Sequence, residues 1–360
     1  MKNFETLLAM LLIALCPLAF TACSDDDDEG GSAYGSDTAG QVTGSNGSTY
    51  YITACNKMSF DYEDGRIVAI DDGYFDYEVT YNPFTITYAD GDPNEDDSYE
   101  VYTISNIKVN SSGYITSLSI SGESRYYYNS GNCYYYDKGS GSASFSYDSD
   151  GHLVKTSVSV SNSGKDVYYD EVESYSGSGS VTTTNTWSDG LLTKSVYNYS
   201  YKESGYSETA TSTDTYEYST SYPNVTYQFT PWDYDVVGDL CSDFDILEPL
   251  AIVGYFGKGP DYHPTSRESE WIEYDSDDYD YESDGSYTYK YDINSYGAVS
   301  KYYYKSSSKW YGYSFTYNLL SSSTKSVGLT DSEEAKPATR EHRGMFRKLL
   351  SKKSATATEE

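Results

Sequence analysis

A hairpin turn followed by a β-branched strand recurs along the chain and constrains its fold more than any other feature. The clearest copy spans residues 147–160, where Asp150-Gly151 separates two alternating stretches. Glycine supplies the positive φ of a tight turn, and a preceding Asp or Asn tolerates that geometry. Five segments share the pattern, at residues 60–70, 109–118, 147–160, 187–196 and 291–301.

The spacing of these turns predicts an antiparallel meander. Gly65, Gly113, Gly151 and Gly190 are separated by 48, 38 and 39 residues. A period of that length holds two strands and two turns, and the second turn of each interval is predicted at residues 90–97, 129–132 and 161–166. The fold class predicted is therefore all-β, a meander of repeated hairpins that is curved or barrel-like.

Composition supports strands and adds an unusual core. Tyrosine occupies 45 of the 360 positions, and net charge is −32 with only 24 basic residues, which argues against nucleic acid as a partner. Alternating rows at residues 84–88, 197–201, 287–291 and 311–317 place rings on one sheet face. Tyrosine triplets at residues 126–128, 134–136 and 302–304 place rings on both faces. Either both faces are covered, or one displays tyrosine to solvent or a ligand.

Residues 1–22 are predicted to be a lipoprotein signal peptide. Lys2 precedes an apolar run over residues 7–15, which is too short to span a bilayer. Ala22-Cys23 resembles the cleavage and lipidation site of bacterial lipoproteins, although Phe20 stands where Leu is commonest. The resemblance implies acylation of Cys23, and two or more acyl chains anchor a protein stably to a membrane. A plain secretory signal is the alternative.

Residues 23–49 are predicted to form an acidic and Gly/Ser-rich tether. Residues 24–29, Ser-Asp-Asp-Asp-Asp-Glu, resemble the export signal that sends Bacteroidetes-type lipoproteins to the outer face of the outer membrane; a solvated acidic spacer is the alternative. Asp37-Thr38-Ala39 resembles the O-glycosylation acceptor of the same bacteria, which makes Thr38 a candidate site, although three residues also match by chance. The resemblances imply a lipid-anchored protein exposed on the outer surface of the cell.

No catalytic constellation or cofactor site is found in the sequence. Cys55, Cys133 and Cys241 match neither a zinc site nor a disulfide framework, so one bridge with a free thiol and three buried thiols both remain open. Because His152, His263 and His342 lie in separate segments, the parts of a metallohydrolase or a catalytic triad are missing. We therefore predict a chain that is not an enzyme.

A calcium site is the strongest metal hypothesis, and the residues favour a simpler interpretation. The segment at residues 280–285 places oxygen atoms at alternate positions before Gly285, as an EF-hand loop does. Tyr291, however, stands where that loop needs a bidentate Glu. Because Asp-Gly is also an ordinary hairpin turn, no metal site is predicted.

The β-meander domain is predicted over residues 50–330, with a Pro-rich insertion at about residues 223–265. Leu240, Phe244 and Leu247 recur at helical spacing and predict one short helix there. We expect the insertion to pack against the sheet and close one end of it. Residues 331–360 form a basic tail with 7 basic and 6 acidic residues, which predicts either an amphipathic helix or a solvated tail.

Taken together, the lipidation motif, the acidic leader, the Asp-x-Gly hairpins and the late insertion resemble an uncharacterised family of Bacteroidetes-type surface lipoproteins with a porin-like fold. The resemblance covers most of residues 50–320 and implies a curved or barrel-like sheet, with no activity. We expect a binding or structural role at the cell envelope, on a glycan or another surface component, through tyrosine-rich faces. A polysaccharide hydrolase using paired carboxylates is the competing function.

Overall fold

The computed structural model describes residues 39–73, 75–91, 98–127, 134–168, 171–203, 205–226, 229, 246–276 and 280–319. The chain divides into two compact units, Met1–Ser32 and Ala33–Glu360, and every described residue belongs to the second, which alone is described below. The predicted signal peptide, most of the tether and the basic tail lie outside the described residues. The same holds for Cys23, Thr38, Cys133, Cys241 and His342.

The described residues form seventeen strands in one antiparallel sheet and one short helix. The first nine strands are β1 (Gln41–Thr43), β2 (Thr49–Cys55), β3 (Met58–Glu63), β4 (Arg66–Asp71), β5 (Asp76–Tyr81), β6 (Phe84–Asp90), β7 (Tyr99–Val109), β8 (Ile115–Tyr127) and β9 (Tyr134–Tyr147). The others are β10 (Leu153–Tyr168), β11 (Glu171–Ser188), β12 (Leu191–Glu203), β13 (Tyr206–Pro223), β14 (Tyr262–Asp275), β15 (Asp280–Ile293), β16 (Val299–Ser306) and β17 (Lys309–Leu319), with helix α3 at Leu247–Ile252 before β14.

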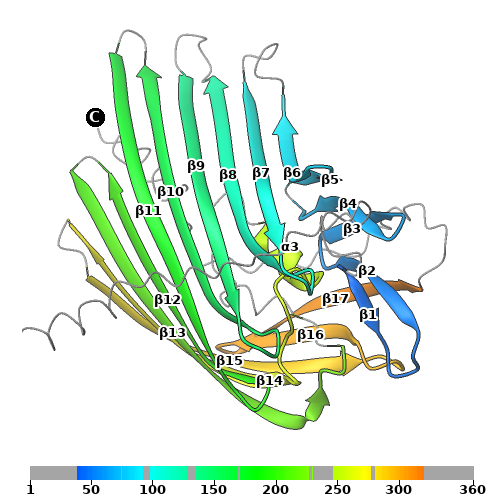
Figure 1. The fold of residues 1–360 in the computed structure, drawn as a ribbon. Helices are drawn as coiled ribbons and strands as arrows, with labels where there is room; N and C mark the ends of the chain where they lie inside the picture. Colours follow the sequence, from blue (N-terminus) through cyan, green and yellow to red (C-terminus); the bar gives the residue numbers. More distant parts are fainter. Residues whose placement is uncertain are drawn as a thin grey trace, which may run out of the picture. The chain divides into compact units, whose positions relative to one another are not determined.

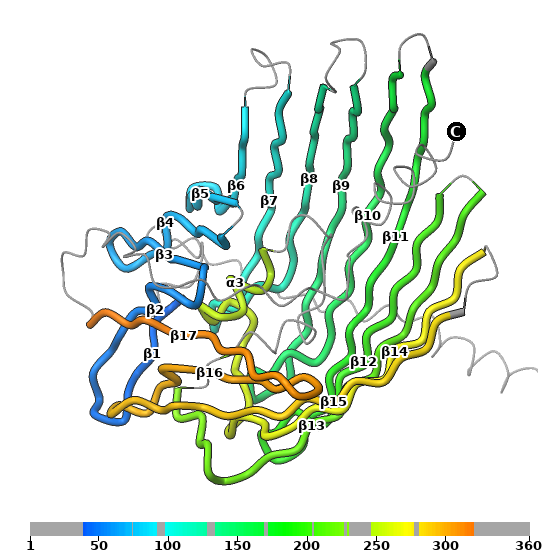
Figure 2. Tube along the Cα trace, turned by 180° about the vertical axis from the view of Figure 1, so that it is seen from behind, coloured from blue at the N-terminus to red at the C-terminus, as the bar shows by residue number. Residues whose placement is uncertain are grey.

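The sheet closes on itself. From β2 to β17 each strand pairs with the next, and β17 returns to β2 with Phe315 opposite Cys55, so sixteen strands form a closed barrel. The short strand β1 pairs with residues 49–51 of β2, whereas β3 pairs with residues 54–55 of the same strand. Strand order around the barrel therefore follows chain order (Figures 1 and 2). The predicted antiparallel meander is confirmed, and the sheet is a barrel.

All five predicted hairpin turns are present, and the alternation of an antiparallel meander places them at one end of the barrel. They connect β3 to β4, β7 to β8, β9 to β10, β11 to β12 and β15 to β16. Their glycines have positive φ, as the turns require: Gly65 (84°), Gly113 (81°), Gly151 (88°), Gly190 (75°) and Gly297 (91°). We call this end the turn end and the opposite end, with the hairpins β6–β7 to β16–β17, the rim.

One predicted turn is wrong. Residues 161–166 lie inside β10, which continues without a break to Tyr168. The structure shows why a glycine is needed there, because a Cβ on Gly164 would collide with the ring and hydroxyl of Tyr175 on the neighbouring strand. The glycine gives the tyrosine room to lie across the sheet and makes no turn.

The Pro-rich insertion closes the turn end, as predicted. One described part of it, residues 246–261, here called the plug, contains α3 (Figure 1). Five residues of α3 are buried. Ring contacts join Phe256 to Phe145, with centroids 4.7 Å apart. Backbone hydrogen bonds from Ile115 to Tyr255, from Lys258 to Gly151 and from Asp261 to Gly190 tie the plug to three hairpins. In the described part of the chain, no helix has the length and apolar character needed to cross a membrane.

The two faces of the barrel wall differ in chemistry. Directly paired residues share a face, and successive residues alternate between faces. The inner face carries the core, for example Leu118, Ala143, Val158 and Val181 in one cross-strand row. The outer face of the same strands carries hydroxyl groups, as in the neighbouring row Ser119, Ser142, Ser159, Ser180 and Ser200.

Candidate functional site

The alternating tyrosine rows point to the inside of the barrel. On β15, β16 and β17 seven of these rings form a continuous series, which we call the tyrosine ladder: Tyr287, Tyr289, Tyr291, Tyr302, Tyr304, Tyr311 and Tyr313. Ring centroids are 5.0 Å apart for Tyr304 and Tyr311, and 5.7 Å apart for Tyr302 and Tyr313. In the triplet at residues 302–304, the central Tyr303 points outward and donates its hydroxyl to Asp292.

The tyrosine ladder becomes more exposed toward the rim. Tyr289 and Tyr302 are 3% and 2% exposed and pack in the core, whereas Tyr287 and Tyr304 are half-buried. Farther along the inner face of β15, Tyr281 is 44% exposed. Burial, followed by the neighbouring tyrosines, raises the pKa of Tyr304 to about 12. Solvent thus reaches neutral aromatic rings on the inner face, and their hydroxyls both donate and accept hydrogen bonds.

Strand β14 supplies charged neighbours to the tyrosine ladder. The Arg267 guanidinium carbon lies 4.5 Å from the centre of the Tyr287 ring, and its Nη1 lies 3.9 Å from Oδ2 of Asp214. Nε1 of Trp271 donates a hydrogen bond of 3.2 Å to Glu273. Because all these residues occupy inner positions in the register of β13, β14 and β15, they share one face with the rings. The site therefore combines flat aromatic surfaces with carboxylates and a guanidinium.

Carboxylates on the inner wall are repeatedly hydrogen-bonded to an aromatic residue two positions away on the same strand. Spacing of two places both side chains on one face. The pairs are Glu100–Tyr102 at 2.9 Å, Tyr201–Glu203 at 3.4 Å, Tyr206–Glu208 at 2.9 Å and Trp271–Glu273 at 3.2 Å. These pairs were not predicted from the sequence, although an acid and an aromatic residue at positions i and i+2 of an alternating strand are a signal for them.

Asp137 is the most perturbed carboxylate of the inner wall. It is 7% exposed on β9 and accepts a hydrogen bond of 3.1 Å from the hydroxyl of Tyr175 on β11. Burial raises its pKa to about 6, although hydrogen bonds partly offset the increase. Such a group can be neutral in mildly acidic water, but it is held in the wall by its partners.

A second cluster, Asp148, Asp150 and His152, holds atoms that could bind a metal within 4.8 Å of one another. Asp148 Oδ1 accepts the backbone N–H groups of Asp150 and His152, and Oδ2 lies 3.0 Å from His152 Nδ1. Although burial opposes it, these hydrogen bonds lower the pKa of Asp148. Asn110 and Asn294 accept the equivalent backbone bonds in their own turns. The shared geometry is that of a turn.

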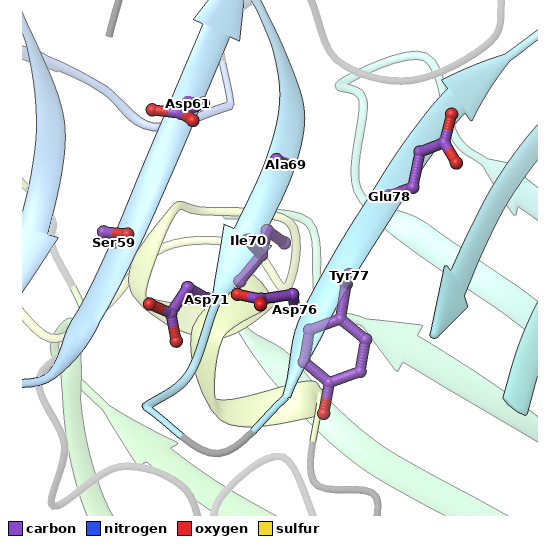
Figure 3. Close-up of a pocket in the computed structure, with 8 residues that line it drawn as sticks. All are labelled: Ser59, Asp61, Ala69, Ile70, Asp71, Asp76, Tyr77 and Glu78. Carbon is purple, nitrogen blue, oxygen red and sulfur yellow. The ribbon is translucent and has the colours of Figure 1, made fainter. Parts of the chain in front are cut away.

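The outer face of β3, β4 and β5 carries an acidic hollow of about 420 Å³. Four carboxylates line it together with Ser59, namely those of Asp61, Asp71, Asp76 and Glu78 (Figure 3). Burial raises the pKa of Asp71, and the backbone N–H of Gly73 donates to it. The hollow lies on the opposite side of the wall from the plug and the tyrosine ladder.

Cys55, His152 and His263, which the sequence singled out, have packing roles in the core or in a turn. Cys55 is a fully buried free thiol whose pKa is raised by burial. His263 is 1% exposed and stacks on Tyr291, and burial lowers its pKa to about 3. His152 stacks on Trp187 with centroids 4.3 Å apart. Cys55 and His263 therefore contribute to the core, and His152 contributes to a hairpin at the turn end.

No protein-family model matches the chain, and no curated protein matches it. Solved structures to which the chain shows some similarity include a porin-like protein from Bacteroides vulgatus ATCC 8482, at 11% identity over 75% of this chain and 99% of that one, with a TM-score of 0.41. Another is a porin-like protein from Bacteroides uniformis ATCC 8492, at 11% identity over 65% and 97% of the two chains, with a TM-score of 0.22. The barrel itself is established by the strand pairings of this chain.

Proposed function

We propose that this protein is a surface-exposed, lipid-anchored binding protein of the outer membrane that takes a glycan on the inner face of its barrel. The observation that carries the proposal is the tyrosine ladder, whose rings run from the buried core toward the rim with Trp271, Glu273 and Arg267 beside them. Sugar rings stack on such aromatic faces, and their hydroxyls hydrogen-bond to carboxylates and guanidinium groups.

The outer face supports a barrel that stands in water. A barrel that crosses a bilayer presents an apolar band about 25 Å tall to the lipid. Here the outward positions of β8 to β11 are mainly serine, threonine and charged residues, as in the row Ser117, Ser144, Ser157 and Thr182. In the proposal the membrane is reached through acylated Cys23, and the acidic tether carries the barrel away from the lipid surface.

Binding without catalysis fits the way the inner carboxylates are held. A glycosidase needs one free carboxylic acid and a second carboxylate facing it across the substrate. Glu203, Glu208 and Glu273 each accept a hydrogen bond from an aromatic neighbour, and Asp137 accepts one from Tyr175. These pairs support a recognition surface, in which carboxylates and rings are fixed before the ligand arrives.

The test is a glycan array probed with the chain from residue 23 onward carrying Cys23→Ser, followed by calorimetry on the best ligand. We expect Tyr304→Ala to weaken binding about fivefold, because a stacked ring contributes about 1 kcal/mol. Tyr304→Phe keeps the ring and should retain most of the affinity.

The matched control is Tyr303→Ala, which removes the neighbouring outward-facing ring of the same strand. It should leave affinity unchanged. Equal losses at positions 303 and 304, or an array without any bound glycan, would contradict the proposal. Release of reducing ends from the bound glycan would show an enzyme instead.

A further inference from the structure

Between β6 and β15 the described lysine and arginine side chains face outward with one exception, whereas acidic side chains lie on both faces of the wall. From β6 to β15 the inner positions carry these acids: Asp90, Glu100, Asp137, Asp166, Glu173, Glu203, Glu208, Asp214, Glu273 and Asp275. In the described part of these strands, Arg267 is the one basic residue on the inner face. The lysines of β9, β10 and β12 face outward, namely Lys138, Lys155, Lys165, Lys194 and Lys202.

The tyrosine ladder already binds cations of the chain itself. The Arg267 guanidinium carbon lies 4.5 Å above the Tyr287 ring, and Nζ of Lys309, at the rim end of β17, lies 5.2 Å above the Tyr311 ring. Aromatic faces attract cations through their negative quadrupole. The rings and the carboxylates of the inner face therefore favour the same sign of ligand charge.

Two buried hydroxyls of the inner wall lack a protein partner in the described part of the chain. Thr156 and Thr183 lie directly opposite each other on β10 and β11, are 0% exposed, and have no hydrogen-bond partner for Oγ1 among the described residues. Thr183 shares a cross-strand row with Tyr197, Ser212 and Trp271. At about 4.8 Å per strand the row from Thr183 to Trp271 spans about 14 Å. A buried hydroxyl without a protein partner is usually satisfied by a small polar group such as water.

We propose that the ligand of the inner face is a glycan bearing protonated amino groups. The carboxylate of Glu273 binds an amine, and the tyrosine ladder stacks on the sugar rings. An acidic glycan would be repelled by the same wall. This inference rests on the proposed glycan-binding function and adds to it the charge of the ligand.

The test compares two oligosaccharides of equal length, a glucosamine oligomer and an N-acetylglucosamine oligomer, on the Cys23→Ser chain from residue 23 onward. The two differ in the charge at each nitrogen and share the same rings. We expect the amine form to bind at least about tenfold more tightly at low salt, and to lose most of that advantage at 1 M salt, where the Debye length is about 3 Å.

Variants on one strand separate the inner face from the general acidity of the protein. Glu273→Gln should lower affinity for the glucosamine oligomer about tenfold, since it removes a charged hydrogen-bond acceptor. Glu270→Gln removes the same charge from an exposed outward position of β14 and should change affinity less than twofold. Circular dichroism and melting temperature establish that both variants are folded.

The possible outcomes separate the inferred charge of the ligand from glycan binding itself. Equal binding of the amine and N-acetyl oligomers would overturn the charge inference and leave glycan binding intact. Binding of neither oligomer, together with a blank glycan array, would overturn both. Tight binding of a lysine-rich peptide without binding of the glucosamine oligomer would also overturn the inference, because it would assign the acidic wall to a protein partner.

Discussion

Single residues set the hairpins at the turn end of the barrel. Asn110, Asp148 and Asn294 each begin a turn and accept the backbone N–H groups of the residues two and four positions later. An amide oxygen and a carboxylate oxygen serve equally well in this role. The chemistry that resembles a metal loop at Asp148 is therefore the chemistry of a turn that occurs twice elsewhere without a carboxylate.

Substitution at Asp148 separates the two interpretations. Asp148→Asn should keep the backbone bonds and cost less than about 1 kcal/mol of unfolding free energy, whereas Asp148→Ala removes three acceptor contacts and should cost about 2 kcal/mol. Urea unfolding of both variants measures the difference. A rise in melting temperature of the parent chain with Zn²⁺, lost in Asp148→Asn, would instead establish a metal site.

Two glycines of β9–β10 and β10 show what a sequence can and cannot predict. Gly151 and Gly164 both follow polar residues, and the pattern predicts a turn at each. Gly151 makes one, with φ of 88°, whereas Gly164 lies in the middle of β10 under the ring of Tyr175. The packing partner comes from a different strand, so the local sequence does not reveal which reason for the glycine applies.

At the scale of elements, the plug depends on close backbone contacts with the hairpins. Gly257 has φ of 93°, and a Cβ there would collide with the carbonyl oxygen of Gly151. Gly254 has a similar φ of 89°, and a Cβ there would meet nothing within 4 Å. The pair therefore isolates the contact between the plug and the β9–β10 hairpin from the conformational requirement common to both glycines.

Alanine substitutions at these two glycines test how the plug is held. Gly254→Ala should cost about 1–2 kcal/mol, the strain of a left-handed conformation. Gly257→Ala should cost at least about 2 kcal/mol more, because the plug must also move away from Gly151. Chemical unfolding gives both values. If the two variants were equally stable, the close contact of Gly257 with Gly151 would not hold the plug against the β9–β10 hairpin.

The strands of the tyrosine ladder also show how far the candidate site could be predicted from the sequence. Alternation in residues 287–291 and 311–317 predicts that their rings share a face, and the structure confirms it. The pattern cannot say which face is the inner one, because that depends on how all sixteen strands close. The pairing of rings from β15, β16 and β17 is a property of the register between strands, which the sequence of one strand does not contain.

For the whole molecule, the meander and its closed turn end could be predicted, whereas closure of the barrel could not. Turn spacing gave the hairpins, and the Pro-rich insertion gave the plug. Closure needs β17 to meet β2, two strands more than 250 residues apart that share no sequence signal of pairing, as in the contact of Thr53 with Thr316 at a separation of 263 residues.

Partitioning in a detergent phase separation tests the proposed placement of the molecule. The full chain, acylated at Cys23, should enter the detergent phase, because several acyl chains hold it there. The chain from residue 24 onward should stay in the aqueous phase, since the outer face of β8 to β11 presents serine rows where a bilayer-spanning barrel would present an apolar band. As a control, the chain without Cys23 is heated until the barrel unfolds and is then separated again. Exposure of its core residues should now move it into the detergent phase. If the folded chain without Cys23 entered the detergent phase, the barrel itself would contact lipid, and the proposed placement in water would be wrong.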